Sequence, residues 1–421
     1  MKYVLFLFYI LILATHLYPS FGAIDKIGFQ WMYLSIVFFF IFNTLIISNR
    51  LSRDELIVNF KSNLKSYVPL LFFISISFIS ITYSYNKSEA IITSSRYLIN
   101  FLILFYFLFF FQKVNSKKLF ESSIIVLLVL ELFVSFAFIY NDIKNDAFIL
   151  RKPIYSGLTG NVNILTSLIL PKIPILLYRL YYTKSIALKV FLILLLQVSA
   201  IVIFSLGSRI SFVVFSIYIF FFTFWIFRTI SLKPILKKSI FTLFLIILFK
   251  VNFSVVNYIE DSSNQDILNQ RLESTIELNG SDDSINSRIR YFKHSLEMFL
   301  ENPIIGLGSG NWKIESVKYD RKNIRNYVVP YHSHNDFLQI LAELGALGLL
   351  SYIIFLLIPL IKLIKNIKSF NSNYFIFLLM SFIAFLLDSA INFPIARPVN
   401  QILFLAFYAF IISYKPVKNE K

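Results

Sequence analysis

The chain has 421 residues, of which 57% are hydrophobic and 15% are charged, and it contains 49 phenylalanines. Soluble domains have far fewer apolar and far more charged side chains, so this composition excludes an ordinary soluble protein and predicts a polytopic membrane protein. The formal net charge of +17 does not predict binding to nucleic acid, because the basic residues lie in short clusters between apolar blocks. The chain has no cysteine, which excludes disulfides, thiolate catalysis and cysteine metal sites.

Apolar blocks of roughly 20 residues recur along the chain, and each is long enough to cross a bilayer as an α-helix. The first block is followed by the small-residue stretch Pro19–Ala23 and resembles a signal peptide, but its apolar run is long for one, so we interpret it as a retained helix. We predict an all-α integral membrane protein with about twelve transmembrane helices, at residues 3–21, 29–48, 67–83, 96–111, 122–140, 161–181, 189–206, 209–228, 236–254, 338–361, 373–391 and 399–414.

Lysine and arginine concentrate in alternate loops, which the positive-inside rule assigns to the cytoplasm. The rule places both termini inside and residues from about 255 to 335 outside. We therefore predict three parts: N-terminal transmembrane helices at 1–254, a large periplasmic loop that carries the catalytic segment at 255–337, and C-terminal transmembrane helices at 338–421.

The predicted outer loop changes character along its length. Residues 252–286 are polar and are predicted to be partly mobile, whereas residues 287–301 carry apolar side chains at spacings of three and four. That spacing predicts an amphipathic helix on the membrane surface, which ends at Asn302 because the residue before Pro303 avoids helical angles. The apolar positions are Ile289, Phe292, Leu296 and Phe299.

Two of the four histidines, His332 and His334, lie at the end of this polar segment, directly before a long apolar run. Histidine titrates near neutral pH, so an imidazole here can take a proton from an attacking hydroxyl group. A solvated loop without a catalytic role is the alternative interpretation. A metal site is not predicted, because His294 is the only further histidine in the outer loop and its spacing is unsuitable.

The residues around the histidine pair have the pattern of a helix start. Ser333 to Asp336 has the Ser-x-x-Asp form in which a serine caps a helix, and the apolar run begins at Phe337. We therefore expect Ser333 and Asn335 to act as capping groups, with Asp336 in the first turn. The histidines should then lie at the outer border between lipid and water.

Three arginines are candidates for binding phosphate. Arg288 and Arg290 lie at the start of the amphipathic helix, and Arg209 begins a predicted span. Guanidinium groups bind phosphate oxygens in a bidentate way and stay charged at every relevant pH. The alternative is that these side chains extend to the lipid headgroups.

Lys172 lies inside an apolar block. A buried charge costs about 3 kcal/mol or more near the bilayer centre, so this lysine should face a cavity or a partner of opposite charge. The candidate partners are Asp388 and Glu131.

Three glycine-containing segments are assigned structural roles. The segment 306–310 has the glycines of a nucleotide loop but no preceding strand and the wrong spacing, so we interpret it as a flexible turn. The segment 157–163 predicts an outer turn that caps the next span, with substrate contact by Asn161 as the alternative. Gly345 and Gly348 are expected to allow close helix packing.

Several of these stretches together resemble the O-antigen ligase-like family of envelope glycan transferases, which includes O-antigen ligases and O-antigen polymerases. The segments cover roughly residues 157 to 398, and their order makes the set more specific than any one of them. The matching segments are Gly160–Asn163, Ser208–Arg209, Ser287–Arg288, Asn302–Gly308, His332–Gln339, Glu343–Gly345 with Gly348, and Asn392–Pro394.

The resemblance implies an enzyme of the bacterial inner membrane whose active site faces the periplasm. Such an enzyme moves a glycan from undecaprenyl diphosphate to an acceptor hydroxyl group, without nucleotide or cofactor. The expected acceptor is lipid A–core, as in a ligase; a second repeat unit, as in a polymerase, and a protein serine or threonine are alternatives. By the same resemblance His334 is the base, His332 is the second choice, and Arg209 and Arg288, with Arg290 nearby, hold the diphosphate. Supporting roles fall to Asn335, Asp336, Asn161 and Lys172.

A membrane transporter or flippase is the alternative from another functional class. Transporters are typically built from repeated halves with broken helices and charges near the midplane. The sequence has no recognisable internal repeat, and Lys172 is the one residue that favours a transporter. A purely structural membrane scaffold would leave the histidine pair and the arginines unexplained.

Overall fold

The computed structural model describes residues 2–17, 26–47, 52–229, 283–322, 329–370 and 373–415. Helices make up the regular structure of these residues, and no β-strand occurs among them, so the predicted all-α class is confirmed for this part of the chain. The chain divides into two compact units. Unit 1 contains Met1–Ser116, Gly280–Phe375 and Leu386–Lys421, and unit 2 contains Lys117–Asn279 and Ile376–Phe385.

Eight helices of the described chain are long and apolar enough to cross a membrane, which confirms a multi-pass membrane protein. Three shorter apolar helices, at Lys2–Leu17, Ile210–Ile226 and Pro398–Ser413, coincide with further predicted spans. The predicted span 236–254 lies outside the described residues, as does most of the polar segment 252–286. The total of twelve spans therefore stays a prediction, and so do the three parts into which the loop at 255–337 would divide the chain. The eight helices are Lys26–Leu45, Leu64–Thr82, Lys87–Val114, Lys117–Lys144, Val162–Tyr182, Ile186–Ser205, Asp336–Ser369 and Asn373–Ile391.

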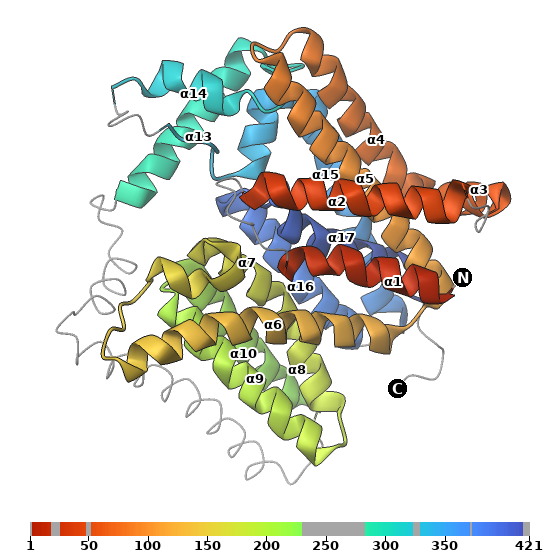
Figure 1. The fold of residues 1–421 in the computed structure, drawn as a ribbon, viewed down its shortest axis with the longest axis vertical. Helices are drawn as coiled ribbons and strands as arrows, with labels where there is room; N and C mark the ends of the chain where they lie inside the picture. Colours follow the sequence, from red (N-terminus) through yellow and green to blue (C-terminus); the bar gives the residue numbers. More distant parts are fainter. Residues whose placement is uncertain are drawn as a thin grey trace. The chain divides into compact units, whose positions relative to one another are not determined.

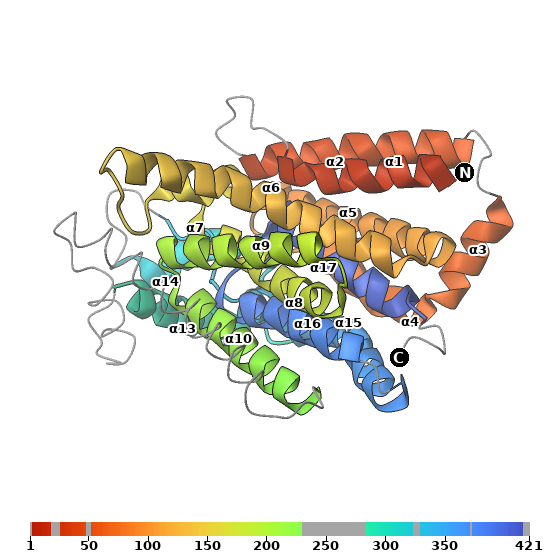
Figure 2. The ribbon, with the colours of Figure 1, turned by 90° about the horizontal axis from the view of Figure 1, so that it is seen from below.

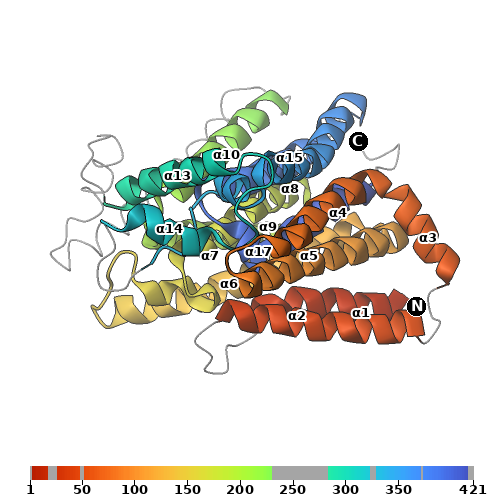
Figure 3. The ribbon, with the colours of Figure 1, turned by 90° about the horizontal axis from the view of Figure 1, so that it is seen from above.

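Unit 1 is built around two long helices, α5 and α15. In Figures 1 and 3, α4 and α5 form a hairpin, α15 packs along α4, and α17 packs along α5. Aromatic side chains fill the contact between α5 and α17, where the rings of Phe111 and Phe410 lie 5.5 Å apart, edge to face. The helices of unit 1 are α1 (Lys2–Leu13), η1 (Ala14–Leu17), α2 (Lys26–Phe42), η2 (Asn43–Ile47), α3 (Arg53–Ser62), α4 (Leu64–Ile79), η3 (Ser80–Thr82), α5 (Lys87–Val114), α13 (Asp283–Glu301), α14 (Trp312–Asp320), α15 (Asp336–Phe370), η6 (Pro394–Ala396) and α17 (Pro398–Ser413).

The predicted amphipathic helix is confirmed as part of α13, which lies with α14 at the end of unit 1 where α4 meets α5 (Figure 1). Its buried face is not the predicted apolar one: Ser295 and Met298 are buried, whereas Ile289 and Leu296 are exposed. The buried face packs against α15 and against Trp312 of α14. An exposed apolar stripe is what a helix on a membrane surface would present to lipid.

Unit 2 contains a bundle in which α8, α9 and α10 lie side by side (Figures 1 and 2), with α6 packed against α8 and α9. The helix α16 (Asn373–Ile391) contributes residues to both units. The other helices of unit 2 are α6 (Lys117–Lys144), η4 (Pro153–Thr159), α7 (Val162–Ile169), η5 (Leu170–Lys172), α8 (Ile173–Tyr182), α9 (Ile186–Ser205) and α10 (Arg209–Thr229).

The fully buried Lys172 has its partner inside unit 2. Its ammonium group lies 2.7 and 2.5 Å from the two carboxylate oxygens of Glu131, and it donates a third hydrogen bond to the carbonyl oxygen of Leu168 at 2.9 Å. Of the two candidate partners, Glu131 is therefore the one that pairs with it. A carboxylate with two contacts offsets much of the desolvation of the lysine, which lies where η5 interrupts the helix.

Asn161 caps α7, as predicted. Its side-chain oxygen accepts hydrogen bonds from the backbone N–H groups of Asn163 at 2.9 Å and Ile164 at 3.4 Å. These are the N–H groups that a helix start leaves without an intrahelical partner.

Candidate active site

The helix α15 is broken near its start. Gly345 has φ 64° and ψ −166°, which interrupts the helical ladder and frees backbone groups on both sides of the break. The loop 303–308, which follows α13, binds these groups with its own backbone. The bonds run from Leu307 N to Ala342 O (3.0 Å), from Gly308 N to Glu343 O (2.8 Å), from Ala346 N to Pro303 O (2.9 Å) and from Leu347 N to Ile304 O (3.3 Å).

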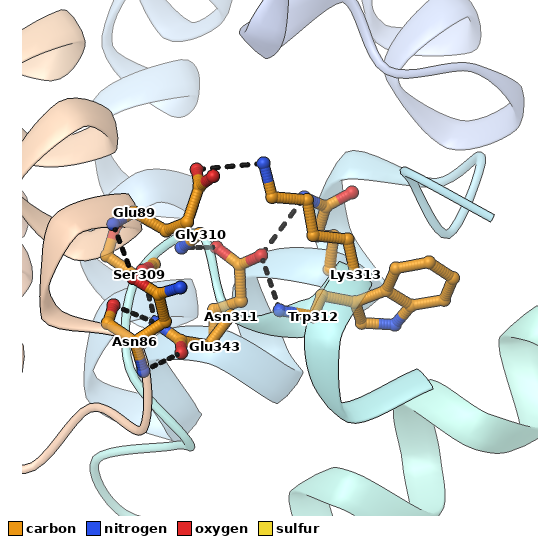
Figure 4. Close-up of polar contacts among 9 residues, drawn as sticks. Asn86, Glu89, Ser309, Gly310, Asn311, Trp312, Lys313 and Glu343 are labelled. Carbon is orange, nitrogen blue, oxygen red and sulfur yellow. Dashed lines mark hydrogen bonds and ion pairs between the residues drawn. The ribbon is translucent and has the colours of Figure 1, made fainter. Parts of the chain in front are cut away.

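The buried carboxylate of Glu343 holds the continuation of this loop. It accepts hydrogen bonds from the backbone N–H groups of Gly310 at 2.7 Å and Trp312 at 3.3 Å, and from the side-chain amide of Gln339 at 3.1 Å. Figure 4 shows Glu343 between the loop and α5, where Asn311 accepts a hydrogen bond from Asn86 N at 2.7 Å.

The segment 306–310 is therefore held on both sides, and the prediction of a flexible turn does not describe it. The N–H groups that a phosphate loop would offer to its ligand are already bonded within unit 1; the N–H of Ser309, for example, donates to the hydroxyl group of Ser80 at 2.9 Å. The broken helix accepts the bonds of Leu307 and Gly308, and no local sequence pattern predicted that break.

The histidine segment leads directly into α15, and of the two expected capping residues only Asn335 caps the helix. Asn335 caps the helix, because its side-chain oxygen accepts a hydrogen bond from Leu338 N at 3.0 Å. The hydroxyl group of Ser333 instead closes a turn: it donates to Asn335 O at 2.8 Å and accepts from Asn335 N at 3.2 Å. Between them His334 has φ 59°, a left-handed conformation that is uncommon outside glycine and is found at functional sites.

Two further hydrogen bonds join the histidine segment to the end of α16 and to the chain that follows it. The side-chain amide of Asn335 donates to the carbonyl oxygen of Ala390 at 2.9 Å, and the buried carboxylate of Asp336 accepts from Ile395 N at 3.1 Å. These bonds set the short segment before α17 beside the histidines. Asn335 and Asp336 are thus positioning residues in this structure.

This arrangement surrounds the histidines with aromatic rings. The ring of His332 stacks on Phe393 with centroids 4.3 Å apart, and His334 meets Phe393 edge to face at 5.0 Å. The guanidinium group of Arg397 lies 4.7 Å from the Phe393 centroid. From α13, Tyr291 presents its ring nearly parallel to that of His334 at 6.3 Å.

Burial and positive charge keep both imidazoles neutral at pH 7. Burial lowers the pKa of His334 to about 4, and the charges of Arg288 and Arg397 contribute to this lowering. Burial also lowers the pKa of His332 to about 3, with a further contribution from Arg397 and an opposing one from a hydrogen bond with Gln339. The Nδ1 atoms of both rings have no hydrogen-bond partner among the described residues. A neutral imidazole with an open ring nitrogen can accept a proton.

The two arginines predicted on α13 differ in their surroundings. Arg290 forms an ion pair with the buried carboxylate of Asp320, with 2.7 Å between Nε and Oδ1, and this favours a structural role. Arg288 instead acts electrostatically on His334. His294 lies on the same helix, with its ring 6.0 Å from that of Tyr319, and burial lowers its pKa.

Arg209 is the first residue of α10 and belongs to unit 2. That Arg209 and Arg288 bind the same diphosphate stays a prediction.

Sequence reasoning assigned no role to Phe393 or Arg397, which the structure sets beside the histidine pair. The signal for Phe393 was the family resemblance, because Asn392–Pro394 is one of the segments that carry it, whereas Arg397 lies outside those segments.

The family model described as O-Antigen ligase matches residues 190–353. The match contains Arg209, Arg288, both histidines and the break at Gly345, and it ends before Arg397. No curated protein matches the chain. The family match agrees with the resemblance carried by the histidine segment and with the many membrane helices of the described chain. The family match over residues 190–353 therefore supports the O-antigen ligase-like family, whose ligases and polymerases are membrane glycosyltransferases.

Proposed function

We propose that this protein transfers a glycan from undecaprenyl diphosphate to a hydroxyl group of lipid A–core, at the periplasmic face of the bacterial inner membrane. The observation that carries the proposal is the setting of His334. Its imidazole is neutral, has an open Nδ1 and lies within the influence of two guanidinium groups, those of Arg288 and Arg397. A base next to fixed cations suits a reaction in which a hydroxyl group attacks and a phosphate leaves.

In the proposed reaction, the acceptor hydroxyl oxygen forms a bond to the anomeric carbon of the donor glycan while His334 takes its proton. The bond between that carbon and the diphosphate oxygen breaks, and its electron pair leaves with undecaprenyl diphosphate. Negative charge on the leaving oxygen grows as this bond breaks, so the arginine cations stabilise the transition state more than the ground state. Arg209 is proposed to join Arg288 and Arg397 in this role.

The same cations make the pKa of His334 depend on whether the diphosphate donor is bound. In the free protein, Arg288 and Arg397 help to hold the pKa of His334 at about 4, which makes the imidazole a weak base. A bound diphosphate places negative charge beside these guanidinium groups and offsets their effect. The pKa of His334 should then rise when the donor is bound, so that the base is strongest when a substrate is present.

Replacing Arg397 by glutamine is expected to move the acid limb of the pH profile of kcat/KM to higher pH. The neutral imidazole is the active form, and a pKa of about 4 keeps it neutral above that pH in the free protein. Removal of one positive charge raises this pKa toward the ordinary value of about 6.5 and so protonates the base at a higher pH.

The measurement is kcat/KM against pH for the wild type and the variant. Lys318→Gln is the matched control, because it removes an exposed positive charge on α14 that does not act on His334. An acid limb that moves equally in both variants, or in neither, contradicts the electrostatic role of Arg397.

The same chemistry would serve a polymerase, in which the acceptor is a second lipid-linked repeat unit. The ion pair with Glu131 gives the buried charge of Lys172 a structural explanation, so the proposal does not require a transport role for it. Deletion of the gene, followed by analysis of the surface glycan, distinguishes a ligase from a polymerase. Loss of all attached polymer is expected for the proposed ligase, whereas single attached units would identify a polymerase.

Reconstitution tests the reaction directly. Purified full-length protein in liposomes, supplied with a lipid-linked glycan and lipid A–core, should release undecaprenyl diphosphate only when the acceptor is present. Release that does not depend on an acceptor, or an unchanged surface glycan after gene deletion, would refute the proposal.

A further inference from the structure

At the end of unit 1 opposite the histidines, a cavity of about 1000 Å³ lies between the end of α3, the start of α4 and the ends of α5, α15 and α17. We call it the lysine pocket. Among the described residues, its lining includes five lysines and no aspartate or glutamate: Lys61, Lys65, Lys362, Lys365 and Lys415. All five lie on the side that the positive-inside rule predicts to be cytoplasmic.

Within the described part of the chain, no carboxylate neutralises the positive charge of the lysine pocket. None of the five lysines forms an ion pair with a carboxylate among the described residues, whereas the neighbouring Lys113, outside the pocket, pairs with Glu55 at 2.6 Å. Lys362 donates a hydrogen bond to the carbonyl oxygen of Ile412. Ammonium groups around one cavity repel one another, more strongly at a membrane border than in water, and a bound anion relieves that repulsion.

The rest of the lining suits a ligand with both a polar and an apolar part. The exposed amide side chains of Gln112 and Asn115 can donate hydrogen bonds to phosphate oxygens. Next to them Ile358 and Ile361 of α15 provide an apolar wall. A small inorganic anion would leave this wall and much of the volume unused.

We propose that the lysine pocket binds a phosphate-bearing anion, supplied by the headgroup of an anionic phospholipid of the cytoplasmic leaflet. The phosphate lies among the ammonium groups, and the first part of the acyl chains covers the isoleucines of α15. Basic pockets between membrane helices on the cytoplasmic side bind lipid headgroups by these interactions. The bound lipid would join the ends of α5, α15 and α17, and this inference is independent of the proposed glycan transfer.

The test titrates short-chain phosphatidylglycerol onto the full-length protein in zwitterionic micelles and follows binding by the thermal unfolding temperature. Wild-type protein should show saturable stabilisation. The triple variant Lys61→Gln, Lys65→Gln, Lys365→Gln, which changes three exposed lysines, should bind roughly 100-fold more weakly, at about fivefold per lysine. Lys365→Gln alone should weaken binding about fivefold, and it provides a folded variant if the triple variant is unstable.

The matched control is Lys118→Gln, Lys184→Gln, Lys189→Gln, which changes three exposed lysines of the same predicted side outside the lysine pocket. It should bind phosphatidylglycerol as the wild type does. A parallel titration with inorganic phosphate identifies the source: a response to phosphatidylglycerol alone supports the lipid headgroup, and an equal response to phosphate assigns the anion site to a soluble phosphate. The proposal is overturned by equal weakening in both triple variants, by unchanged affinity in the pocket variants, or by no saturable binding of either anion.

Discussion

Replacing His334 by alanine is expected to lower kcat for glycan transfer by about 10² to 10⁴, the usual contribution of a general base. His334 is preferred to His332 because its charge environment includes both Arg288 and Arg397 and because its backbone is held in a left-handed turn. His332 is more enclosed, stacked on Phe393 and hydrogen-bonded to Gln339, which suits a positioning residue. The measurement is initial-rate kinetics in liposomes.

Two companion variants make this prediction specific. His332→Ala should reduce the rate less than His334→Ala does. Tyr331→Ala should leave it unchanged, because that side chain is exposed and lies outside the ring cluster. Thermal unfolding of each purified variant separates loss of chemistry from loss of fold. A correctly folded His334→Ala protein with the wild-type rate would remove His334 from catalysis, and a larger loss for His332→Ala would make that residue the base.

Replacing Gly345 by alanine is expected to destabilise unit 1 by about 3 kcal/mol or more and to abolish transfer. A Cβ atom at this position would overlap the backbone carbonyl group of Ile304. Backbone atoms cannot rotate away as the end of a flexible side chain can. The positive φ adds strain of about 1 to 2 kcal/mol for an L-residue. The overlap is relieved only if the loop 303–308 moves out of the break in α15. Transfer should then be lost, because that loop joins α13 to the rest of the site.

Gly160→Ala is the matched control for this second prediction. Gly160 also has a positive φ, of 70°, but no atom lies within 4 Å of its would-be Cβ, so the variant bears only the backbone strain. The free energy of unfolding in micelles should therefore fall much further for Gly345→Ala than for Gly160→Ala. Equal losses would mean that the docking of the loop onto α15 adds nothing to stability.

The local features of this chain could be predicted because they depend on neighbours in sequence. A long apolar run in lipid must satisfy its backbone hydrogen bonds internally, so composition alone predicted helices. Spacings of three and four predicted the helix that contains Arg288, and the residues beside the histidine pair placed it at a helix start. The positive charge of Lys172 inside an apolar block likewise predicted a cavity or a partner of opposite charge.

Tertiary structure decided how distant segments meet. Which carboxylate pairs with Lys172 depended on the packing of α6 against α8, and Glu131 was one of two equal candidates in the sequence. Of the two expected capping residues, Asn335 caps α15, and its side-chain amide also donates to the carbonyl oxygen of Ala390 in α16. The break at Gly345 and the arrival of Arg397 beside His334 had no local signature, since each is created by contacts between segments far apart in the chain. Periodicity reports which face of a helix is apolar, but it does not report which segment covers that face.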